Sequence, residues 1–95
     1  MNPELLNRVR AGAFARIVLP EEEQGLSGYI AQDPDRSDSL RFDTLMHNES
    51  GYLEKVSLSL PEKDLLAVHF LPEAPSFVDV DGNAISLQEG FDAGG

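Results

Sequence analysis

Residues 53–71 read LEKVSLSLPEKDLLAVHFL. Polar and apolar side chains alternate over 53–60, which is typical of a strand with one buried face. The run 65–71 is apolar at almost every position, and only PEKD, residues 61–64, separates the two runs. We predict two strands joined by one tight 3₁₀-like turn. In a chain of 95 residues, so short a connection favours a small bent β-barrel.

A short helix is predicted before the first strand. Asn2 is a good helix cap, Pro3 suits the first helical position and Glu4 places an acid in the first turn. Gly12 is a natural stop, so the helix covers about residues 3–11. A helix this short is marginal alone and must dock its apolar face on the fold. That face consists of Leu5, Leu6 and Val9.

Two strands are predicted after this helix. Residues 14–19 are rich in apolar and β-branched side chains, and the run from Pro20 to Gly25 ends them with a solvated turn. Residues 26–31 then alternate between two faces. Gly28 lies within this second run, which indicates a bend or a close approach of another backbone.

The segment 33–39 contains turn-favouring residues and no apolar side chain, so we predict an exposed loop. Beyond it, residues 40–46 place apolar side chains and Thr44 on one period-two face, which favours a strand. Ser39 stands where a helix cap would, so a helix over 40–46 stays open as an alternative.

A hairpin is predicted beyond the proline-flanked linker 72–75. Asp81 and Gly82 suit a two-residue turn, which would place Val78 opposite Ile85. The hairpin needs a surface to cover, either on its own barrel or on a partner. We therefore divide the chain into a barrel with its helix, 1–71, and a hairpin with a flexible acidic tail, 72–95. The candidate partner-binding side chains of this hairpin are Phe77, Val78, Val80, Ile85 and Leu87.

The order of these elements resembles Sm-like and SH3-like small barrels over residues 3–71. The resemblance implies a mainly β fold, a small five-stranded bent barrel with a short N-terminal helix, to which the C-terminal β-hairpin is added. Sm-type proteins read RNA with an acid followed four residues later by asparagine, and with a basic motif near the last turn. Here Asp43 is followed by His47, and PEKD is not basic. The resemblance then implies strand edges and loops that bind protein, with a ring or dimer of this chain open.

The charge of the chain also favours a protein partner over a nucleic acid. The chain holds 17 acidic and 7 basic residues, for a net charge of -10. No lysine or arginine follows Lys63. A chain this acidic repels phosphate backbones, and we therefore expect no nucleic-acid partner. A basic protein partner is favoured instead. The alternative is that the charge only maintains solubility. The acidic run Glu21, Glu22 and Glu23 is a candidate contact, while a plain loop tip is the alternative.

Composition argues against several kinds of chemistry. There is no cysteine, and the two histidines, His47 and His69, are 22 positions apart, so no metal site, cofactor or catalytic triad is expected. We expect His69 to be a half-buried packing residue and His47 to be solvated. A domain of this size has a shallow core, which disfavours an enzyme cleft. No apolar run approaches the roughly 20 residues of a membrane span, so a cytoplasmic protein is expected.

The leading hypothesis is a non-enzymatic, acidic protein-binding module that acts as an adaptor or regulator. A β-grasp ubiquitin-like or sulfur-carrier protein is one alternative, because the chain ends in Gly94-Gly95 and such carriers end in di-glycine. Another alternative is an acidic inhibitor of a nucleic-acid-binding protein, which would use Glu21 to Glu23.

Overall fold

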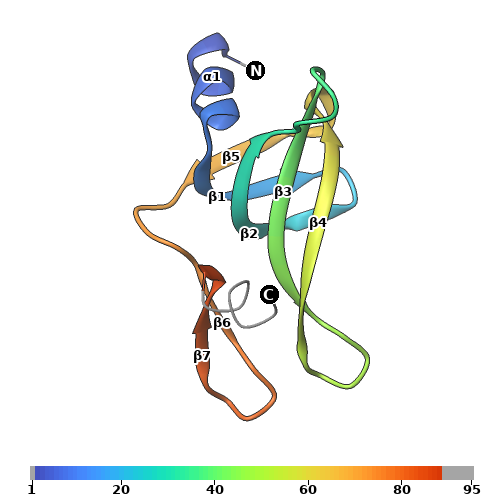
Figure 1. The fold of residues 1–95 in the computed structure, drawn as a ribbon, viewed down its shortest axis with the longest axis vertical. Coiled ribbons are helices and arrows are strands. Elements are labelled where there is room, and N and C mark those ends of the chain that lie inside the picture. Colours follow the sequence, from blue (N-terminus) through green and yellow to red (C-terminus); the bar gives the residue numbers. More distant parts are fainter. Residues whose placement is uncertain (1, 89–95) are drawn as a thin grey trace.

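The computed structural model describes residues 2–88 (Figure 1). One α-helix, α1 (Pro3–Ala11), precedes the strands. The elements that follow are β1 (Ala13–Leu19), β2 (Glu22–Gln32), β3 (Ser39–His47), β4 (Leu53–Pro61), the 3₁₀ turn η1 (Glu62–Asp64), β5 (Ala67–Phe70), β6 (Ser76–Val78) and β7 (Ala84–Ser86). The predicted mainly β fold, with a short N-terminal helix and a 3₁₀ turn at PEKD, is confirmed.

Five strands form one antiparallel sheet in the order β4-β3-β2-β1-β5, and β6 and β7 form a separate hairpin. The sheet curls, so that β1 and β5 cross behind β2, β3 and β4 (Figure 1). β4 and β5 stand at the two ends of the order, and within residues 2–88 no ladder joins them. The five predicted strands are therefore found, whereas a closed barrel is not.

The core lies on one face of this curled sheet. In β3, Leu40 and Phe42 have no exposed surface and Thr44 is almost as buried, which is the predicted period-two face. All nine residues of β3 pair with β4, so the helix alternative for residues 40–46 is excluded. The apolar core cluster comprises Val9, Ala15, Ile17, Leu19, Ile30, Leu40, Phe42, Leu60 and Leu65.

Helix α1 begins and ends where the sequence predicts. The Asn2 side chain accepts a hydrogen bond of 2.8 Å from the backbone N–H of Glu4, and Gly12 ends the helix with a φ of 101°. Val9 is fully buried in the core. At the next position of the helix, Arg10 Nε lies 3.0 Å from Glu62 Oε1 of η1. Packing and this ion pair together hold the helix on the sheet.

Strand β2 bends at Gly28, which confirms the predicted close approach. A side-chain carbon at this position would lie 2.2 Å from the backbone oxygen of Asp43, so only glycine fits. The ladder between β2 and β3 runs from Tyr29 and Asp43 to Gln32 and Leu40. Beyond the end of this ladder, Thr44 Oγ1 donates a 2.7 Å hydrogen bond to the carbonyl of Ser27, and so satisfies a backbone group near the bend.

Strand β2 begins four residues earlier than its predicted start at residue 26. Glu22 and Glu23 belong to it, and Glu22 pairs with Leu19, so the turn consists of Pro20 and Glu21. The interpretation of Glu21 to Glu23 as a plain loop tip is thus wrong for the last two. Paired residues point to the same face of an antiparallel ladder, so Glu22 shares the face of Leu19 and Glu23 takes the other.

Strand β5 is shorter than the predicted run 65–71. Leu65 ends η1, with its backbone N–H bonded to the Glu62 carbonyl, and its side chain enters the core. Leu66 is 61 % exposed instead, because the 3₁₀ turn shifts the alternation. His69 lies on the exposed face of β5, so the prediction of a half-buried packing residue is wrong. The face that packs on the core presents Val68 and Phe70.

The register of the C-terminal hairpin differs from the prediction by one residue. Phe77, not Val78, pairs with Ile85. The turn has three residues between Asp79 and Asn83 rather than two, and Gly82 takes the left-handed conformation with a φ of 84°. This is a type I turn followed by a glycine bulge, which moves the pairing by one position relative to a two-residue turn.

Candidate protein-binding surface

The C-terminal hairpin packs partly on its own sheet. Leu87, which directly follows β7, is 3 % exposed, and it borders a small cavity of about 250 Å³ with Phe14 and Tyr29. Its backbone N–H donates to the Pro75 carbonyl over 2.9 Å. A partner therefore has no access to Leu87 in this conformation.

The remaining hairpin candidates divide by exposure. Phe77 and Ile85 face each other and are half-buried, whereas Val78 and Val80 are 55 % and 51 % exposed. Of the five predicted contact residues, the structure thus leaves two about half exposed, and the other three are more buried.

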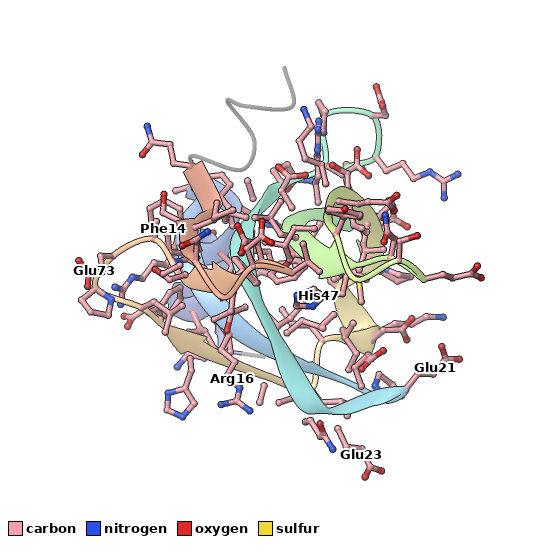
Figure 2. All side chains as sticks on the ribbon, turned by 90° about the horizontal axis from the view of Figure 1, so that it is seen from below. Phe14, Arg16, Glu21, Glu23, His47 and Glu73 are labelled. Carbon is pink, nitrogen blue, oxygen red and sulfur yellow. The ribbon has the colours of Figure 1, made fainter. Side chains whose placement is uncertain are left out.

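His47 ties this hairpin to the sheet. Its Nε2 atom lies 2.7 Å from the carbonyl oxygen of Val78, which can only accept, so the imidazole donates through Nε2–H. The imidazole and the hairpin lie close together in Figure 2. His47 is solvent-exposed, as predicted, but it also has this structural contact, which sequence reasoning missed.

A groove of about 570 Å³ opens beside the turn between β1 and β2. Its apolar wall comes from four strands, and Met46, which is 37 % exposed, is the most accessible of its core-facing side chains. Glu21, Glu22 and Asp64 contribute carboxylates. The groove residues are Leu19, Pro20, Glu21, Glu22, Leu26, Met46, Leu58, Leu60 and Asp64.

The acidic run is divided between this groove and the opposite side of the hairpin. Glu21 and Glu22 border the groove, and Glu23 does not. Figure 2 shows Glu21 and Glu23 extending in different directions from the end of the β1–β2 hairpin. The guanidinium of Arg16 donates to the Gln24 carbonyl, and Arg16 does not border the groove. The groove therefore has carboxylates and no lysine or arginine among its bordering residues.

Strand β4 forms one wall of the groove and one end of the sheet. It pairs with β3 from Leu53 to Pro61 without a register shift, and within residues 2–88 no strand pairs with its other edge. Such an edge presents backbone donors and acceptors to any extended chain that approaches it. Leu58 and Leu60 lie on the face of β4 that borders the groove.

The other face of β3 and β4 carries a hydrogen-bonded polar cluster next to the buried side chain of Leu45. Ser57 Oγ donates to Asp43 Oδ1 over 2.6 Å, and Arg41 Nε lies 3.2 Å from the same oxygen. Ser59 Oγ donates to Asp33 Oδ2 over 2.6 Å. The hydroxyl of Ser59 and the backbone N–H of Asp35 lower the pKa of Asp33. Asp43, the acid of the Sm-like comparison, is thus used within the sheet.

In the part of the chain that the structure describes, no group of three metal-ligating side chains comes together. No helix there is long and apolar enough to cross a membrane. The acidic tail and Gly94-Gly95 lie outside the described residues.

Comparison with family models, curated proteins and solved structures gave no match in any of the three.

The groove is the surface that sequence reasoning missed. It is assembled from β1, β2, β3, β4 and η1, so no single run of residues in the sequence predicts it. The sequence held one indication, because Met46 continues the period-two face of Leu40 and Phe42. In the structure its side chain is exposed beyond the end of the core.

Proposed function

We propose that this chain is a non-enzymatic module that binds an extended segment of another protein along β4. One observation carries the proposal: β4 is a nine-residue edge strand that also forms a wall of an open groove. A chain added to such an edge gains backbone hydrogen bonds from the strand and side-chain contacts from the groove. The class of function is adaptor or regulator.

The small-barrel relationship is part of this proposal. A helix, four strands, a 3₁₀ turn and a fifth strand follow each other in the order expected of Sm-like and SH3-like domains. The curl of the sheet supports the same relationship (Figure 1). Protein binding through strand edges and loops is what this resemblance implies.

The other candidates gain less support. For the carrier class, the segment 33–38 after the first hairpin is a turn and not a helix. For the inhibitor class, Glu21 and Glu23 extend in different directions rather than forming one acidic face (Figure 2). The C-terminal hairpin offers Val78 and Val80 to a partner, but its larger apolar side chains, Phe77, Ile85 and Leu87, are at least half-buried.

The test is a selection of protein fragments that bind the full chain, followed by amide hydrogen exchange with each binder. We expect added protection at the amides of β4, because a paired amide exchanges only when the added strand dissociates. β5, the strand at the opposite end of the sheet, is the internal control and should keep its exchange rates.

Two outcomes would contradict the proposal. The first is a selection that yields no saturable binder. The second is protection confined to regions away from β4 and the groove, such as the exposed side of β6 and β7. If the only binder is a second copy of the chain, sedimentation will show concentration-dependent assembly, and the module would be a self-associating one.

A further inference from the structure

The groove between β4 and the β1–β2 hairpin has two chemical features that together specify an occupant. Its interior is apolar, with side chains from β1 to β4, and its acidic groups come from the turn before β2, from the first residue of β2 and from η1. We propose that it binds a segment with an apolar anchor and lysine or arginine on the same face, an inference that rests on the proposed function above.

The charge argument starts from the bordering residues. Glu21, Glu22 and Asp64 belong to the groove, and no cation does. Arg16 of β1 does not border the groove, and its guanidinium donates to the Gln24 carbonyl, so the groove carboxylates stay open to an incoming cation. The chain as a whole has a net charge of -10, which attracts a basic segment from a distance and repels an acidic one.

The apolar argument rests on surface that the fold leaves uncovered. Met46 is 37 % exposed although it continues the face of Phe42, which is fully buried. Leu26 and Leu58 pack only partly against the core. A volume of about 570 Å³ can hold one or two large side chains together with the stems of flanking cations.

The geometry of β4 sets the spacing of these groups in the occupant. Leu58 and Leu60 are two residues apart and lie on the groove side, whereas Ser57 and Ser59 face the polar side. A strand added beside β4 shares this alternation. The occupant therefore places its apolar anchor at one position and its cations two residues before and after it.

Three synthetic nine-residue peptides test this with the full chain. The first has leucine at its centre and arginine two residues to either side; the second replaces both arginines by neutral citrulline; the third replaces the leucine by serine. We expect the first to bind most tightly by fluorescence anisotropy. The citrulline peptide should bind about tenfold more weakly, because two exposed ion pairs are removed. The serine peptide should lose a similar factor or more, because the apolar anchor is gone.

Matched protein variants assign the effect to the groove. Glu22→Gln should weaken binding of the arginine peptide about threefold, and Glu23→Gln, which removes the same charge from the opposite face of β2, should leave it unchanged. Met46→Gln should weaken binding about fivefold, because it removes an apolar contact. Val80→Gln, an exposed apolar side chain outside the groove, is its control.

Equal effects of Glu22→Gln and Glu23→Gln would overturn the inference, because attraction by net charge alone predicts that result. Equal binding of the arginine and citrulline peptides would overturn it as well. These outcomes are distinct from failure of the proposed function: a fragment selection can yield binders that protect β4 and are not basic. In that case the module stands and its partner chemistry differs from the one inferred here.

Discussion

The turn at residues 48–52 connects β3 to β4, and the turn at residues 79–83 connects β6 to β7. The two turns share a hydrogen-bond pattern, but their hairpins differ greatly in length. In each turn, the side chain at the first position accepts two backbone hydrogen bonds. Asn48 accepts from the N–H groups of Ser50 and Tyr52, and Asp79 accepts from those of Asp81 and Asn83. The glycine at the fourth position of each turn has a φ of 86° or 84°. Yet nine residue pairs join β3 to β4, and three join β6 to β7.

The comparison separates local from tertiary causes. The sequences NESGY and DVDGN share an Asn or Asp at the first position and a glycine at the fourth, and these alone account for the turn. The length of the ladder depends on what the strands bury. β3 places Leu40 and Phe42 in the core, whereas the strands β6 and β7 bury none of their side chains completely. Identical turns therefore start hairpins whose stability differs.

The two tips also touch. A side-chain carbon on Gly51 would lie 3.6 Å from Val80 Cγ2, and the ends of both hairpins lie side by side in Figure 1. With the His47 contact to the Val78 carbonyl, this places the short hairpin along the long one. The short β6–β7 hairpin is thus positioned by its contacts with the long β3–β4 hairpin.

The largest expected difference comes from truncating one phenylalanine in each hairpin. Phe42→Ala should lower the free energy of unfolding by about 3–5 kcal/mol, because it opens a cavity at a fully buried site. Phe77→Ala should lower it by roughly 1 kcal/mol, because the ring is only half-buried. Urea denaturation measures both, and Phe42→Leu serves where the alanine variant fails to fold. Equal losses would mean that the C-terminal hairpin belongs to the same cooperative core.

A smaller effect is expected at the two turn glycines. Gly51→Ala and Gly82→Ala impose the same left-handed strain, about 1–2 kcal/mol, and neither new methyl group meets a clash. We expect Gly51→Ala to lower global stability by this amount. Gly82→Ala should instead accelerate amide exchange in β6 and β7 while the urea midpoint stays near that of the unaltered chain. A global loss from Gly82→Ala equal to that from Gly51→Ala would contradict the difference between the hairpins.

The smallest effect concerns the acid stability of the contact between Ser59 of β4 and Asp33, in the loop that leads into the long hairpin. Hydrogen bonds from Ser59 and the Asp35 backbone lower the pKa of Asp33 below its ordinary value of 3.8. The stability they contribute is present above the unfolded pKa and is lost as pH falls from about 3.8 through the lower folded pKa. Ser59→Ala should make unfolding less pH-dependent in this window, as measured by urea midpoints between pH 2 and 5. Ser57→Ala, which leaves the Asp33 contacts intact, is the control.

Much of the fold could be predicted because its signals are local. Helix α1 follows from its Asn2 cap and the Gly12 stop, the 3₁₀ turn from PEKD, and the period-two face of β3 from the alternation over 40–46. Each of these depends on residues within one turn or one strand of each other. Only the start of β2 and the bounds of β5 departed from the predicted bounds of the sheet strands by more than one residue or shortened a strand.

The candidate site could not be predicted to the same degree. Glu21 and Glu22 were recognised as candidate contacts, but their groove partners Met46 and Leu58 come from other strands. The exposure of the hairpin candidates could not be predicted for a related reason, because Leu87 is buried against residues of β1 and β2 that are distant in sequence. Which apolar side chains stay exposed depends on which neighbours cover them.

By itself, the sequence determined the number and type of the elements of the sheet, the positions of both turns and the acidity of the chain. These properties depend on backbone preferences and charges that are complete within a few residues. Only the tertiary structure decided that the sheet ends at β4 and β5, that Leu65 and not Leu66 enters the core, and that the short hairpin packs beside β3. It also decided that Glu22 and Met46 border one groove. Burial is shared among segments far apart in the chain, so its outcome exists only once all of them have packed together.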